Sequence, residues 1–196
     1  MWKPSQAAPG IAARWRARGQ DLDWTKLIFD LIDLRSFSNL WYWIALAVTW
    51  SSASHWVLGI PYDMVLRARR VVGQAEADLE AIARINVGRI LYIVGEAGAI
   101  LLAMLAFALT TLALLGFVYR VEFCQAVFLI AAPLSGVGFL SVATARRIEA
   151  EGDQGETLRR RLALHRVTVQ VIGMVSIFVT AFWGMLQNFN LSILPG

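Results

Sequence analysis

Hydrophobic residues in this chain are gathered into four long windows that contain no Asp, Glu, Lys or Arg. A helix needs about 20 predominantly apolar residues to cross the hydrocarbon core of a bilayer, and each window is longer than that. Backbone polar groups in lipid must be satisfied within the segment, which favours helices. The pattern predicts an all-α polytopic membrane protein, a four-helix transmembrane bundle with spans near 38–60, 90–118, 124–145 and 167–191.

The first predicted span has a mixed character. Its first half, Leu40–Trp50, is strongly apolar, but three serines and His55 follow before the chain becomes apolar again at Trp56. Tryptophans lie towards both ends, as is typical of the membrane–water interface. We expect a spanning helix whose polar side faces other helices, with a re-entrant or interfacial segment as the alternative.

The chain before this span has two parts. Residues 1–23 contain prolines, glycines and three arginines around Trp15, which predicts a flexible or surface-adsorbed segment. In residues 24–35 the apolar side chains share one helical face and Lys26 lies opposite them, which is typical of an amphipathic helix lying flat in the headgroup region. We therefore divide the chain into a basic N-terminus with an interfacial helix, 1–35, and a membrane domain, 36–196.

Composition agrees with this interpretation. The chain is 58% hydrophobic and 16% charged, against about 45–50% and about 25% in an average soluble domain. These values exclude a soluble monomer and a disordered protein. A net charge of +4 is compatible with an anionic partner, but the apolar composition points to a bilayer and not to nucleic acid. Cys124 is the single cysteine, so no intramolecular disulfide forms.

Basic residues predict the orientation. The two long connections, 61–89 and 146–166, together carry eleven arginines, whereas the connection between the second and third spans carries only Arg120. Basic connections stay in the cytoplasm. We expect both long loops on the cytoplasmic side of the inner membrane and both termini outside; if the first segment does not cross, the N-terminus is cytoplasmic.

The same arginines suggest two further predictions. A shift of 77 positions superposes four arginines of the first loop on four of the second, which indicates a two-plus-two repeat or a coincidence between two arginine-rich segments. Arginine clusters at a membrane face bind anionic lipid headgroups, and a cytoplasmic protein partner is the alternative. The residues predicted to dock lipid or a partner are Arg67, Arg69, Arg70, Arg146, Arg147, Arg159, Arg160 and Arg161.

Small residues recur at helical spacing in the later spans. Transmembrane helices associate through close packing of such residues, so we expect these stripes to be helix–helix seams. The second span carries Gly95, Ala99, Ala103, Ala106, Thr110 and Ala113, and the fourth carries Gly173, Ser176, Thr180, Gly184 and Gln187. The third offers Ala131, Ser135 and Gly138, with a kink expected at Pro133.

Three residues are candidates for chemistry. Glu96 is the one acidic residue within a span, and an ionisable group there indicates a proton or ion path or a carboxylate that is protonated or capped by a loop arginine. His55 and His165 fall on the same side as Glu96. Imidazole suits haem or a bacteriochlorophyll-type pigment, and Ser51 lies one turn before His55, as a small residue does beside a flat cofactor. His165 as a solvated interface residue is the alternative, and no metal-binding spacing occurs.

The stretch RSFSNLWYWIALAVTWSSASHWVLGIPYDMVLRARR, residues 35–70, resembles a group of uncharacterised bacterial inner-membrane proteins, some labelled as a component of the Suf iron–sulfur assembly complex. The resemblance implies a small multi-span protein and transfers no catalytic residues. A single cysteine is a poor scaffold for an iron–sulfur centre.

From these patterns we expect a non-enzymatic accessory, scaffold or assembly subunit that packs against membrane proteins or docks a cytoplasmic one. A haem- or pigment-binding protein using His55 and His165 is one alternative. A small transporter, or its membrane subunit, with Glu96 in the path is the other.

Overall fold

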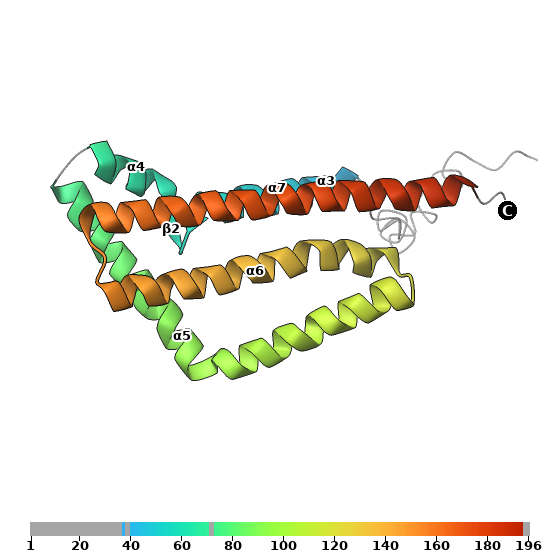
Figure 1. Ribbon diagram of the computed structural model, residues 1–196, viewed down its shortest axis with the longest axis horizontal. Coiled ribbons are helices and arrows are strands. Elements are labelled where there is room, and N and C mark those ends of the chain that lie inside the picture. The colour runs from blue at the N-terminus through green and yellow to red at the C-terminus, as the bar shows by residue number, and fades with distance from the viewer. Residues whose placement is uncertain (1–36, 38–39, 71–72, 194–196) are drawn as a thin grey trace, which may run out of the picture. The chain divides into compact units, whose positions relative to one another are not determined.

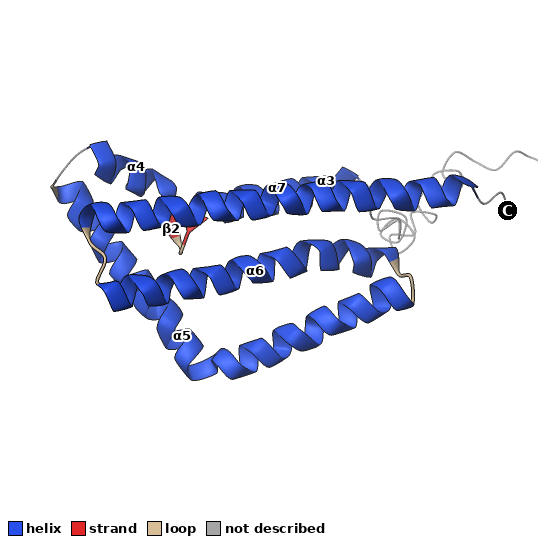
Figure 2. Cartoon of the chain, in the orientation of Figure 1, coloured by secondary structure: helices blue, strands red, loops and turns tan. Residues whose placement is uncertain are grey.

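The computed structural model describes residue 37 and residues 40–70 and 73–193, all within the unit Arg35–Gly196. The predicted basic N-terminus and interfacial helix lie outside the described residues. The described part is mostly helical, with five α-helices and one short hairpin (Figures 1 and 2). Its elements are α3 (Leu40–His55), β1 (Trp56–Val57), β2 (Ile60–Pro61), α4 (Tyr62–Arg70), α5 (Gln74–Ala113), the π-helix η2 (Leu114–Val118), α6 (Glu122–Glu151) and α7 (Gly155–Ile193).

Three of the described helices are long and apolar enough to cross a membrane: Gln74–Val118, Glu122–Glu151 and Gly155–Gln187. The first two ranges contain the second and third predicted spans, and the fourth predicted span, 167–191, lies within α7 as a whole. The first predicted span is α3 followed by the hairpin. Helix α3 has 16 residues and is therefore only about 24 Å long. By length alone it is too short to cross a membrane.

The segments predicted as long loops are largely helical. The apolar helices simply continue past their hydrophobic parts: α5 starts 16 residues before Ile90, and α6 and α7 meet at a turn of three residues. Gly152 ends α6 in the left-handed conformation, with φ of 63°, and the Asp153 amide donates to the Ile148 carbonyl at 3.2 Å. This is a Schellman cap, which satisfies the last carbonyls of the helix without a longer loop.

The largest buried cluster lies where these helix extensions meet, and we call this region the basic end: the hairpin, α4, the first four turns of α5 and the α6–α7 turn. Its buried apolar residues come from all of these elements: Val57, Leu58, Ile60, Val65, Ala68, Leu79, Ala83, Val87, Ala145, Ile148, Leu158 and Leu162. A core of this kind is stabilised by the hydrophobic effect, which requires water around it.

The hairpin turns at Leu58 and Gly59, which have φ of 52° and 74°. Positive φ at both central residues is the geometry of a type I′ turn, where Asn-Gly is the usual sequence. Leu58 is only 4% exposed, so its burial offsets the unfavourable backbone. Asn86 Nδ2 of α5 donates to the Gly59 carbonyl at 3.2 Å and holds the turn against that helix.

Helix α3 runs along α7 and antiparallel to it, as Figure 1 shows. The Phe37 amide donates to Glu122 Oε1 at 2.9 Å, at the start of α6. Trp50, in the second half of α3, packs on Gly173 of α7, and α3 then leads into the buried hairpin. The chain therefore passes from the end where α6 begins, which we call the distal end, to the basic end.

At the distal end the side chain of Gln125 joins three elements. Its Nε2 donates to the Gly116 carbonyl of η2 at 2.7 Å, and its Oε1 accepts from Trp183 Nε1 at 3.0 Å and Gln187 Nε2 at 2.7 Å, both on α7. A Cβ on Gly116 would lie 2.9 Å from the backbone nitrogen of Gln125. The close approach of η2 and α6 therefore requires glycine here.

Pro133 lies inside α6 and has no amide hydrogen to offer the Leu129 carbonyl. Ser176 Oγ of α7 donates to that carbonyl at 3.4 Å. A neighbouring helix thus compensates the proline, as is usual where no water is present.

The small-residue stripe of α7 is a helix–helix seam, as predicted. Gly173 and Gly184 are buried against Trp50 and Phe37, and Ser176 and Thr180 are also buried. The stripe of the second span is not a seam within the described chain, because Gly95, Ala99, Ala103, Ala106 and Thr110 of α5 are all exposed. Small residues indicate that a face can pack closely, but not that the packing helix belongs to the same chain.

Candidate functional site

The outer face of α5 is the most exposed apolar surface of the spanning helices. Only 6% of the most apolar window of this span is buried, against 28% in α7. Around the small-residue stripe lie large exposed side chains, including Ile100 at 64% and Phe107 at 74%. The large apolar side chains of this face suit contact with lipid, and its small residues allow another helix to pack closely.

Glu96 lies on this face and is exposed. Within the described part of the chain its carboxylate makes no hydrogen bond and no ion pair. Arg89, on the same side of α5 seven residues earlier, is about 10 Å nearer the basic end and is likewise unpaired there. One alternative predicted from the sequence was a Glu96 carboxylate capped by a loop arginine. None of the described arginines makes that contact.

Beside this face α5 and α6 leave an apolar cavity of about 680 Å³. Helix α5 diverges from α6 along its middle and returns to it at the distal end (Figure 1). Glycines from both helices line the cavity, Gly98 on α5 and Gly138 on α6, and Arg146 lies at its edge towards the basic end. The described chain thus leaves open a space between two of its spanning helices.

His165 of α7 is buried, at 4% exposed, against two hydroxyls of α6. Thr144 Oγ1 lies 3.0 Å from Nδ1, and Ser141 Oγ lies 3.4 Å from Nε2. Both hydroxyls also donate to carbonyls of α6 itself, Thr144 to Leu140 and Ser141 to Val137, so the backbone of α6 fixes their positions beside the imidazole. His165 thus ties α7 to α6 and is not a solvated interface residue, and it lines none of the cavities described here.

His55 ends α3 and is exposed, with its ring against the edge of Trp56. Among the described residues no group of three or more His, Cys, Asp or Glu could hold a metal ion. The structure therefore does not bring His55, His165 and Glu96 into one metal-binding set. Haem or pigment binding through either histidine stays a prediction.

The arginines of the basic end fall into two groups. Arg159 pairs with Glu76 of α5, and Arg161 pairs with Glu151 and Asp153 across the α6–α7 turn. These two arginines join helices at the basic end. The other six arginines predicted to dock lipid or a partner form no hydrogen bond or ion pair within the described ranges: Arg67, Arg69, Arg70, Arg146, Arg147 and Arg160.

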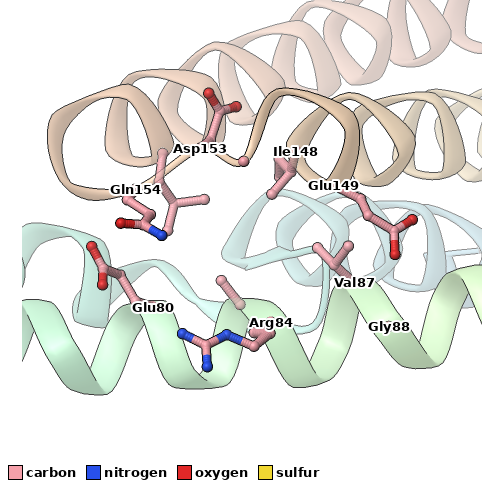
Figure 3. A pocket seen from close by; sticks show the side chains of 11 residues that line it. Glu80, Arg84, Val87, Gly88, Ile148, Glu149, Asp153 and Gln154 are labelled. Atoms are coloured by element: carbon pink, nitrogen blue, oxygen red, sulfur yellow. The ribbon is translucent and has the colours of Figure 1, made fainter.

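A cavity of about 300 Å³ with both charged and apolar residues in its lining lies between α5 and the α6–α7 turn (Figure 3). Figure 3 shows Glu80 at one end, Glu149 at the other and Arg84 along α5. The Glu80 carboxylate accepts from the Gly155 amide at 2.7 Å, and Asp153 pairs with Arg161. Glu80 thus holds the start of α7 on α5, and Asp153 joins the α6–α7 turn to α7, so the interactions around this cavity stabilise the basic end.

Sequence reasoning missed the tyrosine and carboxylates of the basic end. The Arg166 guanidinium lies over the Tyr62 ring, 3.8 Å from its centroid, and Glu76 and Glu80 fasten α7 to α5. No local pattern marks these contacts, because each joins residues far apart in the sequence. Comparison of the chain with protein-family models, curated proteins and solved structures finds no match.

Proposed function

We propose that this protein is a membrane-embedded accessory subunit, and that the outer face of α5 packs against a transmembrane helix of a partner protein. The observation that supports this most strongly is the exposed stripe of small residues on a helix long and apolar enough to span, with the unpaired Glu96 beside it. Small residues allow close helix contact. The proposal explains why a stripe typical of a packed seam has no partner in the described chain.

Glu96 defines the chemistry of the partner. A carboxylate on the lipid-facing side of a spanning helix costs about 2.5–3.5 kcal/mol near the bilayer centre and less near its surface. A lysine, arginine or histidine on the partner helix, at the depth of Glu96, offsets that cost. A second copy in parallel orientation would instead place two Glu96 carboxylates near each other, which is unfavourable.

The proposal includes four crossings, with both termini outside the inner membrane. The contacts of α3 support the first crossing, because Phe37 lies at the distal end near Glu122 and α3 ends in the core of the basic end. Arginines concentrated at the basic end support a cytoplasmic location for it. The arginines of the basic end that form no ion pair within the described residues also suit a cytoplasmic partner.

Co-purification of the tagged protein from mildly solubilised native membranes tests the proposal. Glu96→Lys places two positive charges opposite each other and is expected to lower partner recovery by about tenfold or more. Glu149→Lys, at an exposed carboxylate of the basic end, is the matched charge control. Ala103→Phe should have the effect of Glu96→Lys, whereas Ala181→Phe on exposed α7 should not; equal recovery with all four variants would refute the proposal.

A further inference from the structure

A groove between α4 and α7 at the basic end is formed by two helical faces with the same spacing. Residues at i, i+3, i+4 and i+7 share one face of a helix. Helix α4 contributes Tyr62, Val65, Leu66 and Arg69. Helix α7 contributes Glu156, Arg159, Arg160 and Ala163, and the cavity between them is about 500 Å³.

The groove is basic at its outer end, apolar along Leu66 and Ala163, and closed at its inner end by the contact between Tyr62 and Arg166. Tyr62 lies at Arg166, and α4 and α7 run in opposite directions (Figure 1). Arg69 therefore lies towards the start of α7, where the helix is farthest from its apolar span. Leu66 and Ala163 lie nearer to that span. The groove thus changes from basic to apolar in the direction in which a phospholipid changes from headgroup to acyl chain.

The charges of the groove are unbalanced. Arg159 is paired with Glu76, but Arg69 and Arg160 make no hydrogen bond or ion pair within the described residues. Glu156 is the one carboxylate of the lining. Two unpaired guanidinium groups from different helices face a common space, and guanidinium is well suited to bidentate contact with phosphate oxygens.

We propose that this groove binds one anionic phospholipid, with its phosphate between Arg69 and Arg160 and an acyl chain along Leu66 and Ala163. The apolar side chains of Leu66 and Ala163 next to the two arginines favour a lipid over a soluble phosphate compound or an acidic peptide. Neither Glu96 nor the outer face of α5 takes part, so the site is independent of the partner helix proposed above.

Native mass spectrometry of the full-length protein in neutral detergent tests this site with phosphatidylglycerol and phosphatidylcholine as probes. We expect tighter binding of phosphatidylglycerol. An arginine near an anionic headgroup strengthens binding about fivefold, so Arg69→Gln with Arg160→Gln should weaken binding by about 25-fold. Arg70→Gln with Arg147→Gln removes the same charge from exposed positions outside the groove and should leave binding within about twofold.

A second variant is expected to strengthen lipid binding, an effect that loss of folding cannot produce. Glu156→Gln removes the carboxylate of the groove and should tighten phosphatidylglycerol binding by about fivefold. Equal binding of the two lipids, an equal loss in both double variants, or no gain in Glu156→Gln would overturn the proposal. Displacement of the lipid by millimolar glycerol phosphate or by an acidic peptide would also overturn it, because the acyl chain would then contribute nothing.

Discussion

Trp50 of α3 lies directly on Gly173 of α7, so closely that a Cβ at residue 173 would be 2.8 Å from the Trp50 ring. Gly184 lies in the same way beside Phe37. Two glycines of one helix face thus receive two aromatic side chains from residues 37–55. This contact attaches α3 to the helices that are long enough to span.

Gly173→Ala should therefore destabilise the protein. The added methyl group must displace the Trp50 ring, and overpacking of this kind costs about 1–3 kcal/mol. Unfolding in detergent, followed by circular dichroism against denaturant, measures the change. Gly136→Ala in α6 is the control, because a Cβ there meets nothing within 4 Å; equal effects of the two substitutions would contradict the packing argument.

The path of α3 predicts the side of the membrane for each end of the chain. A tag before residue 37 should be accessible from the same side as a cysteine at Arg120, and from the opposite side to a cysteine at Arg70. Cys124→Ser supplies the cysteine-free background, and labelling with a membrane-impermeant maleimide in intact cells and in inverted vesicles makes the measurement. A tag on the side of Arg70 would mean that α3 does not cross.

Gln125→Leu should loosen the distal end. The substitution leaves the Gly116 carbonyl, Trp183 Nε1 and Gln187 Nε2 without their partner, and each buried polar group left unsatisfied costs about 1–3 kcal/mol. The free energy of unfolding should fall by several kcal/mol. Gln170→Leu, at an exposed position of α7, should change it little; a neutral Gln125→Leu would show that the amide network is not stabilising.

Arg161 and Asp153 should couple strongly in a double-mutant cycle. The Asp153 side chain is only 6% exposed and that of Arg161 22%, and removing one partner of a buried pair costs about 3–5 kcal/mol, less where solvent reaches the pair. Arg161→Met alone should destabilise the α6–α7 turn, and Asp153→Leu in addition should restore part of the loss. Additive effects in unfolding measurements would exclude the coupling.

The sequence predicts the apolar helices well and their surroundings poorly. Four charge-free windows are visible because hydropathy is a local property. The folded core of the basic end is not visible in the sequence, because it brings Val57, Ile60 and Leu79 together through tertiary contacts. Leu58 in a left-handed turn contradicts the usual turn chemistry and is explained only by its burial.

The candidate site shows the same division. Glu96 is recognisable from the sequence as an unusual residue in an apolar helix, but its lack of a partner among the described residues is a property of the fold. The similar spacing of small residues in α5 and α7, at steps of three and four, predicts two seams. Among the described residues α7 has aromatic partners and the stripe of α5 has none, and no local pattern distinguishes the two helices.

Photo-crosslinking from Ala103 of α5 tests the central claim most directly, with Phe178 of α7, which is also exposed, as the control. In native membranes we predict one discrete protein adduct from position 103 and none from position 178. The crosslinked peptide should lie in an apolar segment of the partner that contains a lysine, arginine or histidine, and Glu96→Lys should abolish the adduct. Adducts of position 103 with lipid alone, or with a second copy of this chain, would contradict the account.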